Sequence, residues 1–250
     1  MKQLQDMGIS CQAGHYMDEA VIAQGVSDVT TLPGYREGQF FVQDESSMLP
    51  VLCSGIQPGD TVVDVCSAPG GKALHALQKM QDQGVLSARD VREKKVQLIR
   101  QNVERMGYHS AECIVFDGTK EDKNYEQKAD VILADVPCSG IGIIGKKPEI
   151  KYHALEQAES LVPIQRQICQ AAYTMLKPGG VFIYSTCTIN PGENEDNVEW
   201  LQENLGLQLE SLNPYLPECL QNKMTGQGML QMIPGVMQSD GFFVARLRKA

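Results

Sequence analysis

Apolar and polar residues alternate in blocks along the chain, and from residue 61 onward the blocks switch between the periods of strands and helices. Short apolar runs rich in β-branched residues predict strands at 61–66, 85–90, 111–116, 129–135, 181–187, 207–212 and 241–249. Longer stretches with helical spacing predict helices at 70–83, 92–107, 154–176 and 193–204. Because the two kinds of element alternate, we expect an α/β fold with helices on both faces of a mostly parallel seven-stranded sheet.

Two parts of the chain are less regular. Residues 42–52 predict a helix packed beside the sheet. Residues 1–41 predict a small N-terminal lobe or the remnant of one, which leaves 42–250 as the main domain. Proline and glycine interrupt residues 213–239, and this predicts a long irregular insertion before the last strand.

Unusual residues follow five of the predicted strands. They are CSAPGG after 61–66, Asp90 at the end of 85–90, Asp117 after 111–116, DVPCSG at the end of 129–135 and STC at the end of 181–187. In parallel sheets, ligands bind outside the carboxyl ends of the strands. We therefore expect one site at this edge of the sheet.

The first of these segments indicates a nucleoside ligand. DVCSAPGGK, residues 64–72, puts a glycine pair before a helix, where a ligand can approach the backbone, although a plain tight turn has the same pattern. It matches neither GxGxxG nor the phosphate-binding P-loop. Asp90 follows Gly70 by 20 residues, a separation typical of an acid that accepts both ribose hydroxyls. Asp117 either lies near the adenine or caps a turn. S-adenosylmethionine fits this description.

Two cysteines lie at the same edge. Cys138 shares a turn with Asp135, and Cys187 ends the next strand, although cysteine is often a core residue. Cytosine C5 is a weak nucleophile, and a thiolate that adds at C6 makes C5 enamine-like. A carboxylic acid near N3 favours that addition, and the adduct later loses the C5 proton and the thiol. Two thiols and a carboxylate beside a methyl donor therefore indicate covalent activation of a pyrimidine, with either thiol as the attacker.

The distribution of charge bears on whether the chain binds nucleic acid. The chain of 250 residues has a formal net charge of −9, which is unfavourable for binding a polyanion through the overall field. Basic residues nevertheless cluster in two places, Arg89, Arg92, Lys94, Lys95, Arg100 and Arg105 in the first and Lys146, Lys147 and Lys151 in the second. Each cluster is either a nucleic-acid contact or a solvated face.

Composition also bears on location and metals. No apolar run approaches the length of about 18 residues that spans a membrane, and the first residues lack the apolar core of a signal peptide. We therefore expect a cytoplasmic protein with no membrane contact. The eight cysteines form no CxxC pair and the four histidines no HExxH, so we expect free thiols and no metal site.

The motifs together resemble a known family. DVCSAPGGK, ADVPCSGIGIIGKKPEIK and YSTCTINPGENE resemble the motifs of the Sun/Fmu-type RNA cytosine-5 methyltransferases. The similarity extends from VQDESSM at Val42 to the C-terminal DGFFVARLRK. The segments KKPEIKY and GMLQMIPGVMQSDGFF are most similar to the bacterial 16S rRNA type B, whereas type F shares STCT and FFVARLRK.

The resemblance implies a Rossmann-like class I fold, S-adenosylmethionine as the cofactor and methylation of cytosine C5 in RNA, with 16S rRNA as the substrate. It implies that Cys187 is the nucleophile, that Cys138 assists release of the methylated base, that Asp135 contacts the cytosine and that Lys72 lies beside the reacting groups. The implied cofactor-binding residues are Cys66, Ser67, Ala68, Pro69, Gly70, Gly71, Lys72, Asp90, Asp117 and Asp135. Ser67, Ala73 and Lys95 replace the family's usual alanine, threonine and arginine.

The family also accounts for the acidic charge. Full-length type B enzymes resemble a fusion of a helical RNA-binding domain with the catalytic domain, here residues 42–250. This chain lacks a counterpart of the helical domain, so the resemblance implies a naturally short or a truncated chain. Its own RNA contacts would fall on the 146–151 cluster and the helix at 92–107, and the target base must leave any stack.

Other functions predict different uses of the same residues. In DNA cytosine-5 methyltransferases the cysteine after proline attacks, which would make Cys138 the nucleophile, but STC and NPGENE argue against that class. A cofactor-binding ribosome-assembly factor or a small-molecule methyltransferase would need neither thiol. A type F-like rRNA target or a tRNA target remains an alternative substrate.

Overall fold

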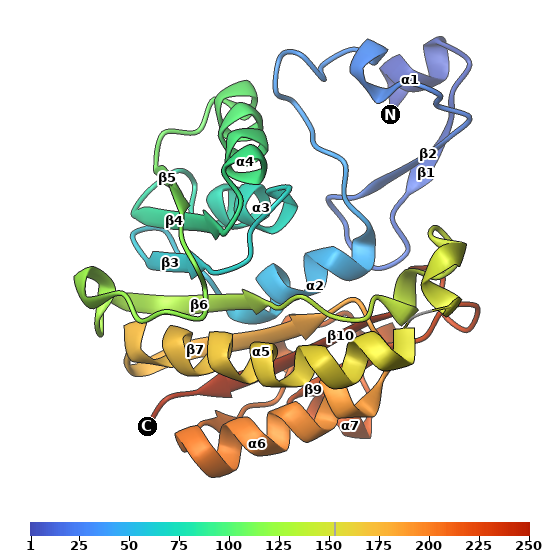
Figure 1. The fold of residues 1–250 in the computed structure, drawn as a ribbon. Coiled ribbons are helices and arrows are strands. Elements are labelled where there is room, and N and C mark those ends of the chain that lie inside the picture. The colour runs from blue at the N-terminus through green and yellow to red at the C-terminus, as the bar shows by residue number, and fades with distance from the viewer. Residues whose placement is uncertain (153) are drawn as a thin grey trace.

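The computed structural model describes the backbone of residues 1–152 and 154–250, and the side chains of 1–150, 152 and 158–250. Its main sheet has the strand order β5-β4-β3-β6-β7-β10-β8, with β9 paired to β10 (Figure 1). The strands are β3 (Thr61–Asp64), β4 (Val85–Asp90), β5 (Ala111–Val115), β6 (Ala129–Asp135), β7 (Leu176–Thr186), β8 (Gln208–Leu209), β9 (Met229–Met232) and β10 (Phe242–Arg248). The first five are parallel and β10 is antiparallel to its neighbours, which confirms the α/β class.

The sheet has eight strands, one more than the seven predicted. The additional strand, β9, lies within residues 213–239, which the sequence predicts to be irregular. Its four residues alternate between partly buried and buried positions. They pair with β10 from Met229, which lies opposite Ala245, to Met232, which lies opposite Phe242. A run this short between glycine and proline gives too weak a period-2 signal to be found, and the pairing with β10 decides the conformation.

Helices cover both faces, as predicted. The longer ones are α2 (Glu45–Ser54), α3 (Gly71–Lys79), α4 (Glu93–Met106), α5 (Ala154–Met175) and α6 (Glu195–Leu205), and the short α7 spans Lys223–Gly226. Alternate residues of each strand enter opposite cores because side chains alternate across a sheet. Val62 and Leu133 pack in the core with α2, α3 and α4, whereas Val63 and Ile132 pack in the core with α5 and α6. Figure 1 shows these two layers above and below the sheet.

Element ends differ from prediction for local reasons. The helix predicted at 42–52 begins at Glu45 because Asp44 caps it by accepting from the Ser46 N–H at 3.1 Å. The strand predicted at 181–187 begins at Leu176, which pairs with Ala129 directly after α5 ends. Gly179, with φ of 75°, provides the left-handed conformation in the KPGG segment.

Residues 1–41 pack on the main domain through apolar and polar contacts, and Met17 is buried in the same core as α2 and α3. They contain α1 (Lys2–Asp6), β1 (Ser10–Ala13), β2 (Val21–Gln24) and the 3-10 helix η1 (Val29–Thr31). The carboxylate of Glu45 accepts three consecutive backbone N–H groups, from His15, Tyr16 and Met17, at 2.9, 2.8 and 3.0 Å. The first residue of α2 therefore fixes the turn between β1 and β2.

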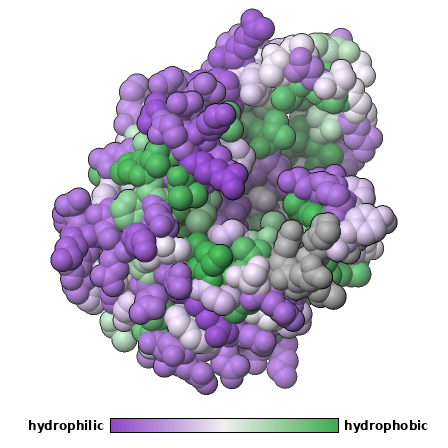
Figure 2. All heavy atoms as spheres, viewed as in Figure 1, coloured by the Kyte–Doolittle hydropathy of each residue, from purple (hydrophilic) through white to green (hydrophobic). Residues whose placement is uncertain are grey.

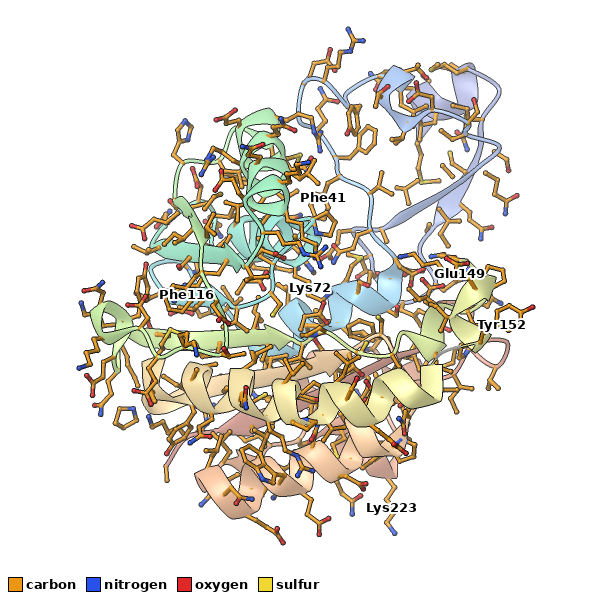
Figure 3. The ribbon with its side chains drawn as sticks, viewed as in Figure 1. Phe41, Lys72, Phe116, Glu149, Tyr152 and Lys223 are labelled. Carbon is orange, nitrogen blue, oxygen red and sulfur yellow. The ribbon has the colours of Figure 1, made fainter. Side chains whose placement is uncertain are left out.

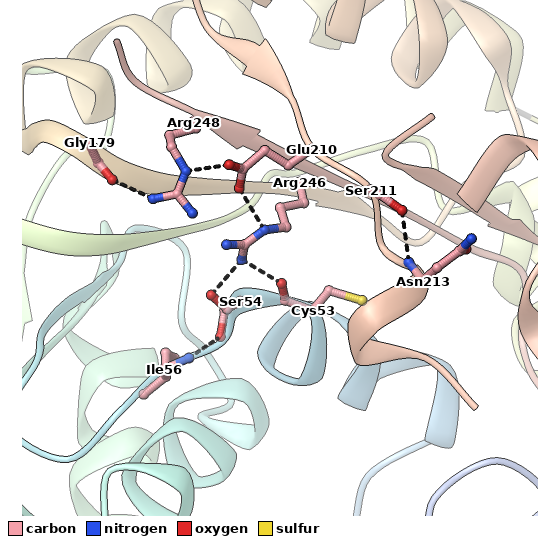
Figure 4. Close-up of polar contacts among 9 residues, drawn as sticks. All are labelled: Cys53, Ser54, Ile56, Gly179, Glu210, Ser211, Asn213, Arg246 and Arg248. Carbon is pink, nitrogen blue, oxygen red and sulfur yellow. Dashed lines mark hydrogen bonds and ion pairs between the residues drawn. The ribbon is translucent and has the colours of Figure 1, made fainter. Parts of the chain in front are cut away.

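At the edge opposite the predicted site, arginines of β10 bind the end of α2 (Figure 4). Arg246 is 3% exposed and donates to the Cys53 and Ser54 carbonyls at 2.8 and 2.6 Å and to Glu210 at 3.0 Å. Arg248 donates to the same carboxylate and to the Gly179 carbonyl. This arrangement satisfies carbonyl groups that a helix C-terminus leaves without intrahelical partners.

A cavity of about 340 Å³ adjoins these arginines, far from the strand ends that carry the cysteines. Its basic lining groups are already paired: Lys177 with Asp130 at 2.6 Å, and both arginines with Glu210. We therefore place no ligand in it.

The burial of Arg246 predicts its contribution to stability. Arg246→Met is expected to lower the free energy of unfolding by about 3–5 kcal/mol, because two buried carbonyls lose their donor and the Glu210 carboxylate loses one of its two arginines. Arg248→Met is the matched control, since Arg248 is 40% exposed at its side chain and should contribute less than about 1 kcal/mol. Urea titration of both variants measures the difference, and equal losses would contradict the assignment.

Candidate active site

The site is built from turns at the carboxyl ends of the central strands. Side chains two residues apart point to the same face of a strand, so Asp64 follows Val62, Asp135 follows Leu133 and Ser185 follows Ile183 into the α2 and α3 side of the sheet. Cys187 comes directly after β7 and packs against the same core. The alternation that builds the core thus also aligns the polar groups of the site.

The two cysteines meet at this edge. Cys138, in the turn after β6, and Cys187, after β7, are both half-buried, and their Sγ atoms lie 3.3 Å apart. A hydrogen bond from the Cys138 thiol holds the pKa of Cys187 below its usual value, against the opposing effect of burial. The same hydrogen bond, together with burial, raises the pKa of Cys138 well above its usual value. Cys187 is therefore the thiol that ionises first and Cys138 the one that keeps its proton.

An ion pair lies beside the thiols. The Lys72 ammonium, at the start of α3, lies 2.8 Å from Asp135 Oδ2 and 5.2 Å from the centre of the Phe242 ring. Ser185 donates to the other oxygen of Asp135 at 2.8 Å. Burial lowers the pKa of Lys72, but the Asp135 carboxylate more than offsets it, so the net pKa is raised. The Lys72 side chain, labelled in Figure 3, is 12% exposed, and its positive charge also stabilises the Cys187 thiolate.

Asp64 is a residue of this site that sequence reasoning did not single out. It is fully buried at the end of β3, and neither of its carboxylate oxygens has a hydrogen-bond partner in the part of the chain that the structure describes. Burial raises its pKa to about 7. The signal in the sequence is an acid inside the otherwise apolar run TVVDV, which core packing does not explain.

The turn from Cys66 to Lys72 fits a nucleoside cofactor with a charged tail. Next to Asp64, the buried Ser67 hydroxyl also lacks a partner among the described residues. The helix α3 begins after Gly70, whose φ is 106°, and no side chain caps its first N–H groups. Free N–H groups bind a carboxylate, and the unpaired Asp64 oxygens accept from an ammonium. Both groups occur in the methionine part of S-adenosylmethionine.

The two acids expected at the adenosine differ in their surroundings. Asp90 is 6% exposed at the end of β4, accepts from the Arg92 N–H at 3.1 Å and lies 3.5 Å from the Lys95 ammonium. Asp117 is exposed, and one of its oxygens accepts from both the N–H and the hydroxyl of Thr119. Asp117 thus lies at the same edge but forms a turn of its own, as the alternative interpretation predicts.

The structure divides the basic clusters. Arg89 is 1% exposed, paired with Asp122 at 3.0 Å and stacked on Phe116 and Tyr125, so its assignment to a possible RNA-contacting face was wrong. Its neighbours in the fold include two aromatic rings that follow β5, and these are what hold a charged residue inside. Figure 3 labels Phe116 at this position.

Four further members of the clusters have partners within the protein, among them Lys95 with Asp90 and Arg100 with the Cys113 carbonyl at 3.2 Å. Arg105 donates to the Tyr35 and Phe40 carbonyls at 2.6 and 3.1 Å, and so attaches residues 1–41 to α4. Lys146 pairs with Asp44 at 2.9 Å and with Asp240 at 2.6 Å. The exposed members with described side chains are Arg92, Lys94, Lys95, Arg100, Lys146 and Lys147. The side chain of Lys151 lies outside the described residues.

The surface around the site is hollowed. Figure 2 shows a depression between α4 and residues 1–41, with apolar side chains visible inside it. In the described part of the chain, no three His, Cys, Asp or Glu residues form a group that could hold a metal ion. None of the helices described is long and apolar enough to cross a membrane.

The parallel sheet with its antiparallel last strand, and the cofactor-type turn after β3, define the class of S-adenosylmethionine-dependent methyltransferases. Residues 52–248 match the family model for the 16S rRNA methyltransferase RsmB/F, and the chain belongs to this family. The predicted resemblance, fold class and cofactor are thereby confirmed.

Curated relatives and solved structures agree with this assignment. The chain is 36% identical over 223 residues to the ribosomal RNA small subunit methyltransferase F of Shewanella amazonensis. The aligned region covers 87% of the chain and 48% of the relative. It is 33% identical over 254 residues to the probable ribosomal RNA small subunit methyltransferase B of Bacillus subtilis, covering 100% of the chain and 56% of the relative. The chain thus spans about half the length of the curated relatives it matches.

Two solved proteins of Pyrococcus horikoshii share the fold. NSun6, solved with the S-adenosylmethionine analogue SFG, has a TM-score of 0.78 at 26% identity, covering 92% of this chain and 59% of that one. A methyltransferase homolog protein has a TM-score of 0.77 at 27% identity, covering 100% and 81%.

Proposed function

We propose that this chain methylates C5 of a cytosine in RNA, with small-subunit rRNA as the substrate, by way of a covalent bond between Cys187 and C6. The observation that carries the proposal is the 3.3 Å contact between two thiols of opposite pKa shift beside the Lys72–Asp135 pair. Neither cofactor binding nor methyl transfer to an oxygen or nitrogen needs such a pair. The names of the relatives support the choice of rRNA.

The protein's residues account for the steps at the base. The Cys187 thiolate adds to C6, the π electrons of the C5–C6 bond form a C4–C5 double bond, and those of the C4–N3 bond move to N3. N3 takes up a proton from water and returns it when the methylated base is released. Asp135, held between Lys72 and Ser185, is the group that contacts the pyrimidine edge. When bound, S-adenosylmethionine supplies an electrophilic methyl group to C5.

Release needs the C5 proton removed and the C6–sulfur bond broken. The C5–H bond breaks and its proton passes to water, while its electrons re-form the C5–C6 double bond and the Cys187 thiolate departs. Cys138, which keeps its proton 3.3 Å from the departing sulfur, assists this step. The proposal makes Cys187 the attacking thiol, unlike the DNA-type arrangement with Cys138, and the lowered pKa of Cys187 supports that choice.

Labelled methyl transfer tests the proposal. We expect the chain to transfer methyl groups from S-adenosylmethionine to unmodified small-subunit rRNA, and mapping should find 5-methylcytosine at a defined position. Unmodified tRNA serves as the comparison substrate. We also propose that the protein acts in the cytoplasm. A preference for tRNA would contradict rRNA as the substrate. A labelled methyl group at any atom other than cytosine C5 would contradict the proposed reaction.

A further inference from the structure

Glu193 is a buried carboxylate without a cation. It ends the 3-10 helix η5 (Pro191–Glu193), is 0% exposed, and has no ion pair in the described part of the chain. Four donors replace the cation. Oε1 accepts from the Ser139 N–H at 2.8 Å and from Gln165 at 2.9 Å, and Oε2 accepts from the Ser139 hydroxyl at 2.5 Å and from Asn190 at 3.2 Å. A buried charge with four hydrogen bonds is costly to assemble, and its partners show what it organises.

The donors reach both thiol-bearing turns. Ser139 follows Cys138, and its hydroxyl also lies 2.9 Å from the hydroxyl of Thr188, which follows Cys187. Because the single hydroxyl proton of Ser139 goes to the carboxylate, Thr188 must be the donor in the second bond. The residue after each cysteine is therefore joined to one carboxylate through a directed chain of hydrogen bonds.

The residue before Cys138 is fixed from the same centre. Gln165 of α5, 0% exposed, donates from one amide nitrogen to Glu193 and to the Pro137 carbonyl, both at 2.9 Å. Its own oxygen accepts from Asn197 at 2.7 Å, which fixes the orientation of the amide. Contacts on both sides of Cys138 leave its turn little freedom to move away from Cys187.

We propose that Glu193, whose two oxygens accept from both thiol-bearing turns, is a positioning residue that sets the contact between the Cys138 and Cys187 sulfurs. The effect of Glu193 on catalysis rests on the proposed function. Its effect on the spacing of the two thiols does not, and it can be measured without RNA. Glu193 touches neither sulfur and acts through Ser139, Thr188 and Gln165.

The carboxylate is required because both of its oxygens accept. In Glu193→Gln an NH₂ group replaces one oxygen and faces donors, and the backbone N–H of Ser139 cannot reverse its direction. We expect this variant to bind S-adenosylmethionine like the wild type, since the cofactor-type turn lies after β3. Methyl transfer should fall by about 10-fold to 100-fold in kcat with little change in KM, as for a small misplacement of reacting groups.

The decisive measurement is the pH dependence of Cys187 alkylation by iodoacetamide, read by peptide mass spectrometry without RNA. If the Cys138 thiol no longer donates to Cys187, the midpoint should move to higher pH in Glu193→Gln. Glu199→Gln, which neutralises an exposed carboxylate of α6, is the control and should leave the midpoint unchanged. A merely structural effect would lower the Tm of Glu193→Gln without moving the midpoint in the folded protein.

Ser139→Ala keeps the inference testable if Glu193→Gln does not fold. It removes only the hydroxyl bridge to Thr188, and we expect a smaller shift of the alkylation midpoint in the same direction. A folded Glu193→Gln or Ser139→Ala protein with the midpoint of the control would overturn the positioning role. Failure of the wild type to methylate RNA would overturn the proposed function instead, because alkylation is measured without RNA.

Discussion

Cys187→Ala is expected to reduce methyl transfer to RNA by more than about 10,000-fold, as loss of a nucleophile does in enzymes with covalent catalysis. Cys187 is the thiol whose pKa is lowered, and the Cys138 hydrogen bond and the Lys72 ammonium stabilise its thiolate. Cys138 lies beside it, but the raised pKa of Cys138 keeps that thiol protonated, so it does not replace Cys187 as the attacking thiolate. The initial rate of labelled methyl transfer measures the loss.

Two controls accompany this variant. Calorimetry should show unchanged affinity for S-adenosylmethionine, because Cys187 lies after β7 and the cofactor-type turn after β3. Cys169→Ala removes a buried thiol of α5 that packs in the opposite core, and its methyl transfer should equal that of the wild type. Undiminished transfer by Cys187→Ala would exclude it as the nucleophile.

Cys138→Ala is expected to trap a covalent protein–RNA adduct that survives denaturing electrophoresis, at a level at least about 10-fold above the wild type. The Cys187 thiolate can still attack, but the departing sulfur loses the thiol that lies 3.3 Å from it. Attack then outpaces release and the intermediate accumulates. The same variant should alkylate at Cys187 with a midpoint at higher pH, because its thiolate has lost its largest stabilising contact.

The double variant identifies the linked residue. Cys138→Ala combined with Cys187→Ala should give no adduct. In the adduct that Cys138→Ala alone traps, peptide mass spectrometry should find the RNA linked to the peptide that contains Cys187. If Cys187→Ala trapped the adduct and Cys138→Ala did not, the roles of the two thiols would be reversed, as in the DNA-type enzymes.

Much of the fold follows from hydrophobic periodicity because the core dominates it. The strands β3, β4 and β6 are buried on both faces and read as apolar runs, so their prediction from sequence succeeds. The prediction misses the strand β9 and begins β7 too late, because both features arise from pairing with other strands. Pairing of that kind leaves little trace in local composition.

The candidate site follows from sequence less completely. The rule that ligands bind at strand ends brings Cys138, Cys187, Asp135 and Lys72 to one edge. There the structure places Cys138 in contact with Cys187, and Lys72 in contact with Asp135. The burial of Arg89 could not be predicted, because arginine is usually a surface residue and its aromatic partners come from other turns. The roles of these residues in catalysis stay predictions.

Glu193 shows a second limit of sequence reasoning. It lies in the NPGENE segment that the sequence singles out, yet its donors Gln165 and Ser139 lie 28 and 54 residues away along the chain. Its place among them becomes visible only when the turn after β6 and the turn after β7 lie side by side.

The position of β10 has a consequence for when the site can form during synthesis. The N–H of Gly241 donates to the Gly142 carbonyl at 2.8 Å, Gly142 in turn donates to the Cys187 carbonyl at 3.0 Å, and the Phe242 ring lies beside Lys72. These contacts come from residues that follow both cysteines along the chain and therefore leave the ribosome after them. Until β10 inserts beside β7, a nascent chain carries both thiols without the contacts that Gly241 and Phe242 make at the site.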